Sequence, residues 1–287
     1  MNLSRFLGVL LAAASTLLVA ACAGGESEDA LDQDDWNVPL HPAAGGERPP
    51  PSGTNGLLPS CFWAHGAQQA LRTLGAAALD SGDGFIPAIA PSLVPESCRQ
   101  VIESAVECAL PQGNVLRDPV TGADYEGRWG LAPSWSTGAL STDGRRYVTA
   151  CLVQRLNITG APVPILLEGP HPAIAETEAL GSLYPIEEST AFGDLFSSGT
   201  PLLGLLPAFN VFVCWEDLLP QSCGLLGLPI LFEERVCDDL PLCGLVALGP
   251  CSLVCADNGP YRKCKPGLLS PWWTQTVRVQ LEEATCH

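Results

Sequence analysis

Cysteines are the residues whose chemistry is easiest to infer in this chain. Thirteen occur among 287 residues, and Cys22 stands apart because it directly follows a long apolar run. The remaining twelve are an even number, so every thiol can pair as a disulfide in an oxidising compartment. We expect disulfides at Cys61, Cys98, Cys108, Cys151, Cys214, Cys223, Cys237, Cys243, Cys251, Cys255, Cys264 and Cys286.

The chain begins with the pattern of a signal peptide. Residues 1–5 carry one positive and no negative charge, and the apolar run 6–21 is broken only by Ser15 and Thr16. Sixteen residues are fewer than the roughly 18 to 20 that a membrane-spanning helix needs. We therefore expect residues 1–21 to be cleaved off during export.

The residues around the expected cleavage site, Val19-Ala20-Ala21-Cys22, resemble the lipobox of bacterial lipoproteins. In that family the cysteine thiol is linked to diacylglycerol, the signal peptide is cleaved before it, and the freed amine receives a further acyl chain such as palmitate. Family members usually have Leu where Val19 stands. The resemblance implies that Cys22 is lipidated, and several acyl chains would hold the protein on a membrane almost permanently.

The residue after Cys22 indicates in which membrane such a lipoprotein is anchored. In this family an Asp in that place tends to retain the protein in the inner membrane, whereas Ala23 stands here. The resemblance therefore implies the outer membrane, facing the periplasm or the cell surface. The alternative is an ordinary secretory signal with Cys22 left as a disulfide partner, but the even number of other cysteines argues against it.

Metal binding and nucleophilic catalysis are the rival chemistries. Structural zinc sites usually combine two closely spaced cysteine pairs, whereas only Cys251 and Cys255 have such spacing. Exported thiols also tend to be oxidised, so we expect neither a metal ion nor a cofactor. The patterns G-x-S-x-G, H-E-x-x-H, S-x-x-K and the phosphate-binding loop are absent, so we assign no catalytic residue.

Two histidines keep a hydrolase open as the alternative function. His65 is expected at the start of the first helix as a partly buried structural residue, and His171 in a rigid surface turn between two prolines. Either would be the general base of an exported hydrolase, although no pattern names its nucleophile. A pocket joining a histidine, a carboxylate and a hydroxyl would favour that function; an exposed His171 would favour a non-enzymatic one.

Acidic pairs and adjacent tryptophans have simpler explanations. Glu187 and Glu188 would point to opposite faces of a strand, so they are not expected to share a glycosidase site. Residues 80–84 lack the third acid and distal Glu of a calcium-binding loop, which favours a solvated turn. In a strand, Trp272 and Trp273 would place one ring inside and one outside, so we expect a single exposed Trp.

Charge limits the possible partners. The formal net charge is −17, and lysine occurs only at Lys263 and Lys265. Nucleic acids and anionic headgroups would be repelled by such a chain, so we expect no nucleic-acid partner. The membrane is the expected partner, through the lipid anchor, while a protein or glycan partner is not identified by the sequence.

The composition predicts a tether followed by helices. Residues 22–57 are rich in Gly, Pro and acidic residues, which is typical of a disordered spacer. Apolar residues at helical spacing predict helices over residues 61–80, 95–110 and 146–157. Cys98 and Cys108 would lie about 15 Å apart on one helix, too far for a disulfide, so each must reach another element, with Cys61 and Cys151 the nearest candidates.

The later part of the chain favours strands and loops. Residues 165–167, which follow Pro162 and Pro164, are expected to form a strand. Alternation predicts strands at residues 209–215 and 276–282, and a final strand is expected to lead into Cys286. We therefore expect an α+β fold in which an N-terminal helical part packs with a disulfide-rich, loop-rich β part. The expected division is a signal peptide at 1–21, a lipidated tether at 22–57, a helix-rich subdomain at 58–205 and a Cys-rich β subdomain at 206–287.

The exported domain also resembles a set of uncharacterised Cys-rich lipoproteins of Gram-negative bacteria, through residues 130–135, 146–152 and 192–196. That set implies no activity. The sequence thus favours an exported, lipid-anchored lipoprotein of the outer membrane that acts as a non-enzymatic binding or structural module, with the hydrolase as its alternative.

Overall fold

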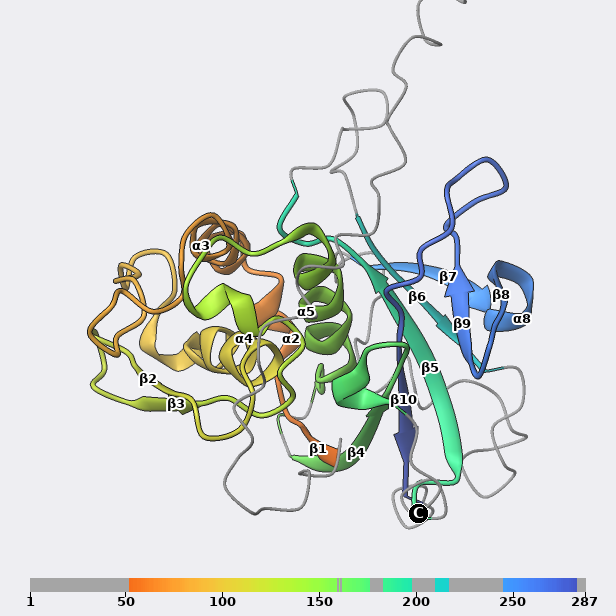
Figure 1. Cartoon of the computed structure of the whole chain (residues 1–287), viewed down its shortest axis with the longest axis horizontal. Coiled ribbons are helices and arrows are strands. Elements are labelled where there is room, and N and C mark those ends of the chain that lie inside the picture. The colour runs from red at the N-terminus through yellow and green to blue at the C-terminus, as the bar shows by residue number, and fades with distance from the viewer. Residues whose placement is uncertain are drawn as a thin grey trace, which may run out of the picture. The chain divides into compact units, whose positions relative to one another are not determined.

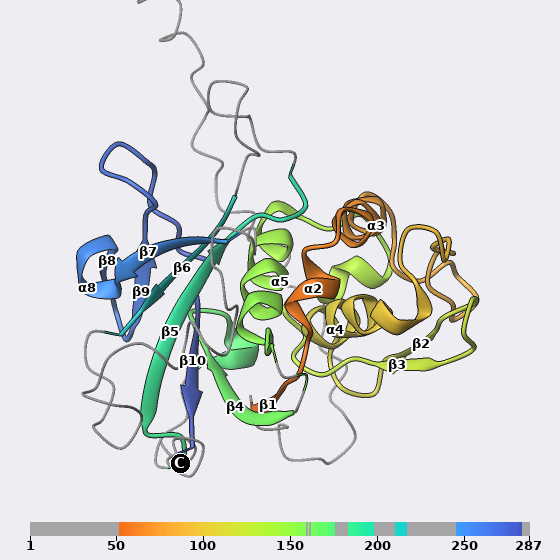
Figure 2. The same cartoon turned by 180° about the vertical axis from the view of Figure 1, so that it is seen from behind.

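A six-stranded mixed sheet forms the centre of the computed structural model, which describes residues 52–158, 160, 162–175, 183–197, 210–216 and 245–282. The strand order is β1-β4-β10-β5-β6-β7, and all neighbours are antiparallel except β6 and β7. Figures 1 and 2 show α2, α3, α4 and α5 on one side of this sheet and α8, β8 and β9 on the other. The predicted α+β class is confirmed.

The elements have the following bounds. The helices are α2 (Pro59–Phe62), α3 (His65–Gly75), α4 (Gln100–Ala109), α5 (Thr142–Gln154) and α8 (Cys251–Val254), with short 3-10 turns at Glu96–Cys98, Pro133–Ser136 and Pro172–Ile174. The strands are β1 (Ser52–Asn55), β2 (Val115–Arg117), β3 (Asp124–Glu126), β4 (Val163–Glu168), β5 (Ile186–Gly193), β6 (Val211–Trp215), β7 (Val246–Pro250), β8 (Cys255–Asn258), β9 (Tyr261–Cys264) and β10 (Val277–Leu281). Within the described ranges, no helix combines the length and the hydropathy needed to cross a bilayer.

The three predicted helices exist, but their boundaries differ from the prediction. The first is divided into α2 and α3, and Gly66 at the start of α3 packs so closely that a Cβ there would lie 2.0 Å from the Leu93 carbonyl oxygen. The third begins four residues earlier than predicted. The reason is Ser141, whose Oγ accepts a hydrogen bond from the Gly144 amide at 3.0 Å and caps α5.

The helical face of the sheet, meaning the face turned toward α5, is apolar. Val277, Val279 and Leu281 alternate along β10 and all belong to the buried core. Gln154, fully buried at the end of α5, fixes the helix on this face. Its Nε2 donates to the backbone oxygens of Ser189 on β5 (3.2 Å) and Val277 on β10 (2.9 Å), and its Oε1 accepts from the Ser189 hydroxyl. One side chain thereby ties α5 to two central strands.

The tether prediction was wrong at its C-terminal end. Ser52–Asn55, which we placed in the tether, form β1 and pair with β4 at the edge of the sheet. Asn55 is 1% exposed, and its Oδ1 accepts hydrogen bonds from Asn157 Nδ2 at 2.9 Å and from the Val163 amide at 3.1 Å. These long-range bonds order a segment whose composition alone does not predict structure. Leu57, the last residue of the predicted tether, is buried in the core, and residues 22–51 lie outside the described residues.

The sheet draws strands from both predicted subdomains. β1 comes from the predicted tether, β4 and β5 come from the helix-rich region, and β6, β7 and β10 come from the Cys-rich region. All the described residues belong to one compact unit, Val38–His287. The predicted boundary between residues 205 and 206 falls outside the described residues, so the two-subdomain division stays a prediction.

Four disulfides cross-link the described residues. Cys61–Cys98 joins α2 to the turn before α4, and Cys108–Cys151 joins α4 to α5. Both agree with the geometric expectation that Cys98 and Cys108 reach other elements. The other two are Cys214–Cys251 and Cys255–Cys264. Five cysteines lie outside the described residues: Cys22, Cys223, Cys237, Cys243 and Cys286.

The length of chain that a disulfide closes predicts how much it stabilises the fold. Cys108–Cys151 spans 43 residues and Cys255–Cys264 spans 9. By loop-closure entropy, replacing both members with Ala should lower the free energy of unfolding by about 4 kcal/mol for the first and about 2.6 kcal/mol for the second. Urea unfolding of the two double variants measures this. A larger loss from the short loop would contradict the entropic account.

Candidate functional site

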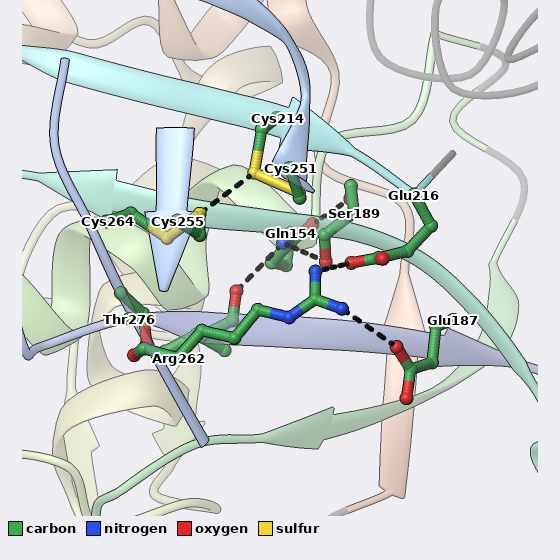
Figure 3. Close-up of a disulfide and its surroundings, with 11 residues drawn as sticks. Gln154, Glu187, Ser189, Cys214, Glu216, Cys251, Cys255, Arg262, Cys264 and Thr276 are labelled. Atoms are coloured by element: carbon green, nitrogen blue, oxygen red, sulfur yellow. Dashed lines mark hydrogen bonds and ion pairs between the residues drawn. A yellow bond between two sulfur atoms is a disulfide. The ribbon is translucent and has the colours of Figure 1, made fainter. Parts of the chain in front are cut away.

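The candidate site lies on the outer face of the sheet, the face opposite α5, where the hairpin of β8 and β9 covers it. Two contacts hold the hairpin in place. Thr276 Oγ1 donates to the Arg262 carbonyl oxygen at 2.7 Å, and Cys264 and Trp273 exchange two backbone hydrogen bonds of 2.9 and 2.7 Å. The hairpin thereby brings the Arg262 side chain over β5 and the residue that follows β6 (Figure 3).

Arg262 pairs with two carboxylates from different elements. Its Nη1 contacts Glu216 Oε1 next to β6, and its Nη2 lies 3.7 Å from Glu187 Oε2 on β5. In Figure 3 the guanidinium lies between these two carboxylates. A second arginine shares Glu187, since Arg278 Nη1 donates to Glu187 Oε1 at 2.7 Å. The outer face thus carries a continuous chain of alternating charges.

The innermost member of this charge network is Glu168 at the end of β4. Its side chain is 2% exposed, and its Oε2 accepts from Arg278 Nη2 at 2.8 Å and from Gln280 Nε2 at 2.5 Å. Burial alone would lower the pKa of Arg278, but the carboxylates of Glu168 and Glu187 outweigh burial and raise it. Arg278 therefore stays charged and pairs with the buried carboxyl group of Glu168.

Glu216 has a different balance. Burial raises the pKa of its carboxyl above the ordinary value, and the hydrogen bond and charge of Arg262 offset only part of that shift. The negative charge of Glu187 raises the pKa further, so burial and Glu187 together outweigh the attraction of Arg262 and Arg278.

Two disulfides lie beside this charge network. Cys214 Sγ, bonded to Cys251, is 3.5 Å from Cys255 Sγ, which is bonded to Cys264 (Figure 3). The sulfurs of Cys214, Cys251 and Cys255 all lie within 4.8 Å of one another, a spacing that thiolates around a metal ion would have. A zinc ion needs thiolates, whereas these sulfurs are oxidised. The sequence pointed to Cys251 and Cys255 alone, and the fold adds Cys214 from β6.

A small pocket opens between the charge network and the hairpin. It encloses about 10 Å³, about the space that one water molecule occupies. Its lining residues are Glu168, Gly169, Thr190, Tyr261, Arg262, Thr276 and Arg278. Glu168, Arg262 and Arg278 belong to the ion pairs described above, and the remaining space accommodates one water molecule.

The surface position predicted for His171 was wrong. The residue is 9% exposed, its ring packs edge-on against Tyr147 with centroids 4.9 Å apart, and its Nδ1 accepts a hydrogen bond from the Ala173 amide. The following 3-10 turn places Ile174 in the core, which draws the preceding residues inward. His171 thus caps a short turn. His65 begins α3, and its side chain lies outside the described residues.

The turn and strand expectations agree with the structure where it describes them. Asp80 Oδ1 accepts from the amides of Gly82 (2.8 Å) and Gly84 (3.0 Å), as in a solvated turn. Trp272 is 42% exposed, while the half-buried ring of Trp273 packs near Phe192 and Phe212. The adjacent tryptophans therefore have one exposed member, as alternation predicts.

Sequence analysis did not identify Glu168, Arg262, Arg278 or Gln280 as site residues. The one signal for a polar outer face was the alternation in the predicted strand 276–282, in which Arg278 and Gln280 occupy polar positions. The pairing of Arg278 with Glu168 crosses 110 residues, and no local pattern encodes such a contact.

Comparisons of this chain with family models, with curated proteins and with solved structures found no match.

The buried ion pair should make a large contribution to stability compared with an exposed one. Arg278→Met leaves the carboxylate of Glu168 buried without its cation and should lower the free energy of unfolding by about 3 to 5 kcal/mol. Arg117→Met is the matched control, because its two-bond pair with Asp124 is half exposed and screened by water. Chemical denaturation should show almost no change for this control.

A second substitution tests whether the loss arises from the stranded carboxylate. Adding Glu168→Gln to Arg278→Met should restore part of the stability, because the buried charge is removed. If the double variant is less stable than Arg278→Met by the full effect of Glu168→Gln alone, the two residues do not interact energetically.

The raised pKa of Glu216 predicts that the stability of the fold depends on pH. Because its folded pKa is raised, protonated Glu216 favours the fold. This contribution is complete below the ordinary Glu pKa of about 4.3 and is lost as the pH rises through the folded pKa. The unfolding free energy of the native chain minus that of Glu216→Gln should therefore fall as the pH is raised from 4 to 8. A difference that grows with pH would mean that the ion pair with Arg262 outweighs burial.

Proposed function

We propose that this chain is an exported lipoprotein, anchored in the outer membrane by lipidated Cys22, whose folded domain is a non-enzymatic binding or structural module. The observation that carries the proposal is the conjunction of Cys22 at the end of the apolar leader with four disulfides in the described domain. Disulfides persist in oxidising compartments and are rare in the cytosol. Their presence supports export, and the leader supplies the route.

The charge network supports a non-enzymatic role. Catalytic acids and bases need a free proton-transfer atom facing a substrate. In the outer-face site, Arg262 and Arg278 instead bind Glu168, Glu187 and Glu216, and the adjacent pocket has room for one water. These groups form their hydrogen bonds and ion pairs with one another, which favours a structural role for the site.

The anchor and the domain have separate tasks in this proposal. The acyl chains fix the chain to the membrane, and the cross-linked domain keeps its shape outside the cytoplasm, where no ATP-dependent refolding is at hand. The net charge of −17 disfavours nucleic acid as a partner and favours solubility. A protein or glycan would be the partner of a binding module.

Mass spectrometry of the protein purified from cell envelopes tests the proposal. The expected polypeptide begins at Cys22, lacks residues 1–21 and carries the added mass of diacylglycerol and an amide-linked acyl chain. Cells fed an alkynyl analogue of palmitate should label the native chain and not Cys22→Ser. An unacylated first residue, or a leader that is retained in the native protein, would refute the proposal.

The residue after Cys22 provides a control for the membrane assignment. Ala23→Asp should keep the acyl label but move the protein toward the inner membrane on a density gradient. Equal distribution of Ala23→Asp and the native chain would remove the basis for the outer-membrane assignment while leaving lipidation intact.

A further inference from the structure

The loop that joins β9 to β10, residues 265–272, carries apolar side chains that nothing covers within the described part of the chain. Leu268 is 90% exposed, Leu269 is 102% exposed and Trp272 is 42% exposed. Single exposed apolar residues are common on protein surfaces, but adjacent ones at the tip of one loop mark an interaction site. Figures 1 and 2 show this segment standing out from the sheet between β9 and β10.

The local charge around the loop is opposite in sign to the net charge of the chain. The only two lysines of the sequence, Lys263 and Lys265, flank its start, and no Asp or Glu occurs between Asp257 and Glu282. The two ammonium nitrogens lie 5.5 and 4.7 Å from the ring centroid of Trp272. A chain with a net charge of −17 therefore presents a local positive site here, and that site surrounds the most exposed apolar side chains among the described residues.

The base of the loop is held firmly. Cys264 is fully buried, bonded to Cys255 and paired through its backbone with Trp273, whose ring has Arg146 stacked on it at 4.6 Å. At the tip the Ser270 amide donates to the Gly267 carbonyl oxygen at 3.2 Å, which closes a turn. The exposed leucines are therefore presented by an ordered turn on a fixed base. Inserting them into a binding partner or a membrane then loses little further conformational entropy.

We infer that the 265–272 loop is a membrane-contact loop, which inserts Leu268 and Leu269 into the surface of a lipid bilayer containing anionic headgroups. Trp272 then lies at the level of the headgroups, where tryptophan is enriched in membrane proteins. Lys263 and Lys265 extend toward lipid phosphates while their methylene stems stay beside the ring. The two leucines occupy the depth that the apolar face of an interfacial segment reaches.

A bilayer fits this loop better than a protein partner does. A stable protein interface buries roughly 800 Å² on each partner, far more than three side chains at a loop tip provide. A bilayer needs no complementary shape, and its attraction grows with each apolar group inserted. The rest of the acidic surface does not prevent contact, because at physiological salt charges further than about 8 Å from the headgroups are largely screened.

The site tested is separate from Cys22, so the inference does not require lipidation. The native protein, purified from envelopes, is mixed with vesicles of phosphatidylcholine and phosphatidylglycerol in about a 3:1 ratio whose acyl chains are brominated. Bromine quenches tryptophan only at short range, and subtracting the signal of Trp272→Phe isolates the contribution of Trp272. We expect clear quenching of that contribution in these vesicles and less in pure phosphatidylcholine.

Two variants separate the apolar and charged contributions. Leu268→Glu with Leu269→Glu should abolish the quenching, because each leucine lost from the interface lowers partitioning by roughly tenfold. Leu183→Glu, a change at another leucine that is 61% exposed, is the matched control and should leave quenching unchanged. Lys263→Gln with Lys265→Gln should weaken quenching only where phosphatidylglycerol is present.

The outcomes distinguish this inference from the proposed function. Absence of quenching in both vesicle types, or equal quenching in the double Glu variant and the native chain, would overturn the membrane-contact loop, whatever the N-terminus carries. An unmodified N-terminus would refute the anchor and leave the quenching result to stand. Far-UV circular dichroism and melting temperatures equal to those of the native chain establish that the variants fold, since all six substituted side chains lie outside the core.

Discussion

The carboxylate of Glu168, buried at the end of β4, is the constraint around which the outer face is organised. A charge removed from water needs an opposite charge and hydrogen-bond donors, and β10 supplies both through Arg278 and Gln280. This requirement places β10 beside β4. Because Arg278 also binds Glu187 on β5, the same strand is held on its other side. The hairpin adds Arg262 and extends the pairing to Glu216. The ion pairs on the outer face thus link β4, β10 and β5 to one another and to the hairpin.

The two faces of the sheet are therefore stabilised by different forces. On the helical face, alternating residues of β10 pack into an apolar core, and Gln154 adds directional bonds that fix α5 against β5 and β10. On the outer face, ion pairs do the positioning and disulfides hold the covering hairpin. Hydrophobic burial fixes which face of each strand points toward the core, and the two-sided ion pair of Arg278 adds a specific geometry that links β10 to β4 and β5. The combination gives one well-defined arrangement of a sheet whose strands come from distant parts of the chain.

The sequence predicted those features that depend on local periodicity or simple geometry. Helical spacing revealed α3, α4 and α5, alternation revealed β10, and the length of a helix excluded a Cys98–Cys108 bond. The sequence missed β1, β2, β3, β5, β7, β8 and β9. Of these, β1 is a four-residue strand that is ordered by pairing with the distant β4, whereas β8 and β9 are four-residue strands that pair with each other as a hairpin and are held on the sheet by the bonds of Cys264 and Thr276. The eight residues of β5 are buried on both faces and have no alternation to recognise. The charge network could not be predicted because its pairs are remote in sequence.

The proximity of the two outer-face disulfides has a consequence for how the protein is oxidised. With Cys214 Sγ only 3.5 Å from Cys255 Sγ, nearness alone does not select the correct partners among these four sulfurs. The register of β8 and β9 makes the choice, since it sets Cys255 directly opposite Cys264. Among the described cysteines that register leaves Cys251 as the partner of Cys214, so the backbone pairing of the hairpin, and not nearness, distinguishes the native disulfides from a Cys214–Cys255 bond.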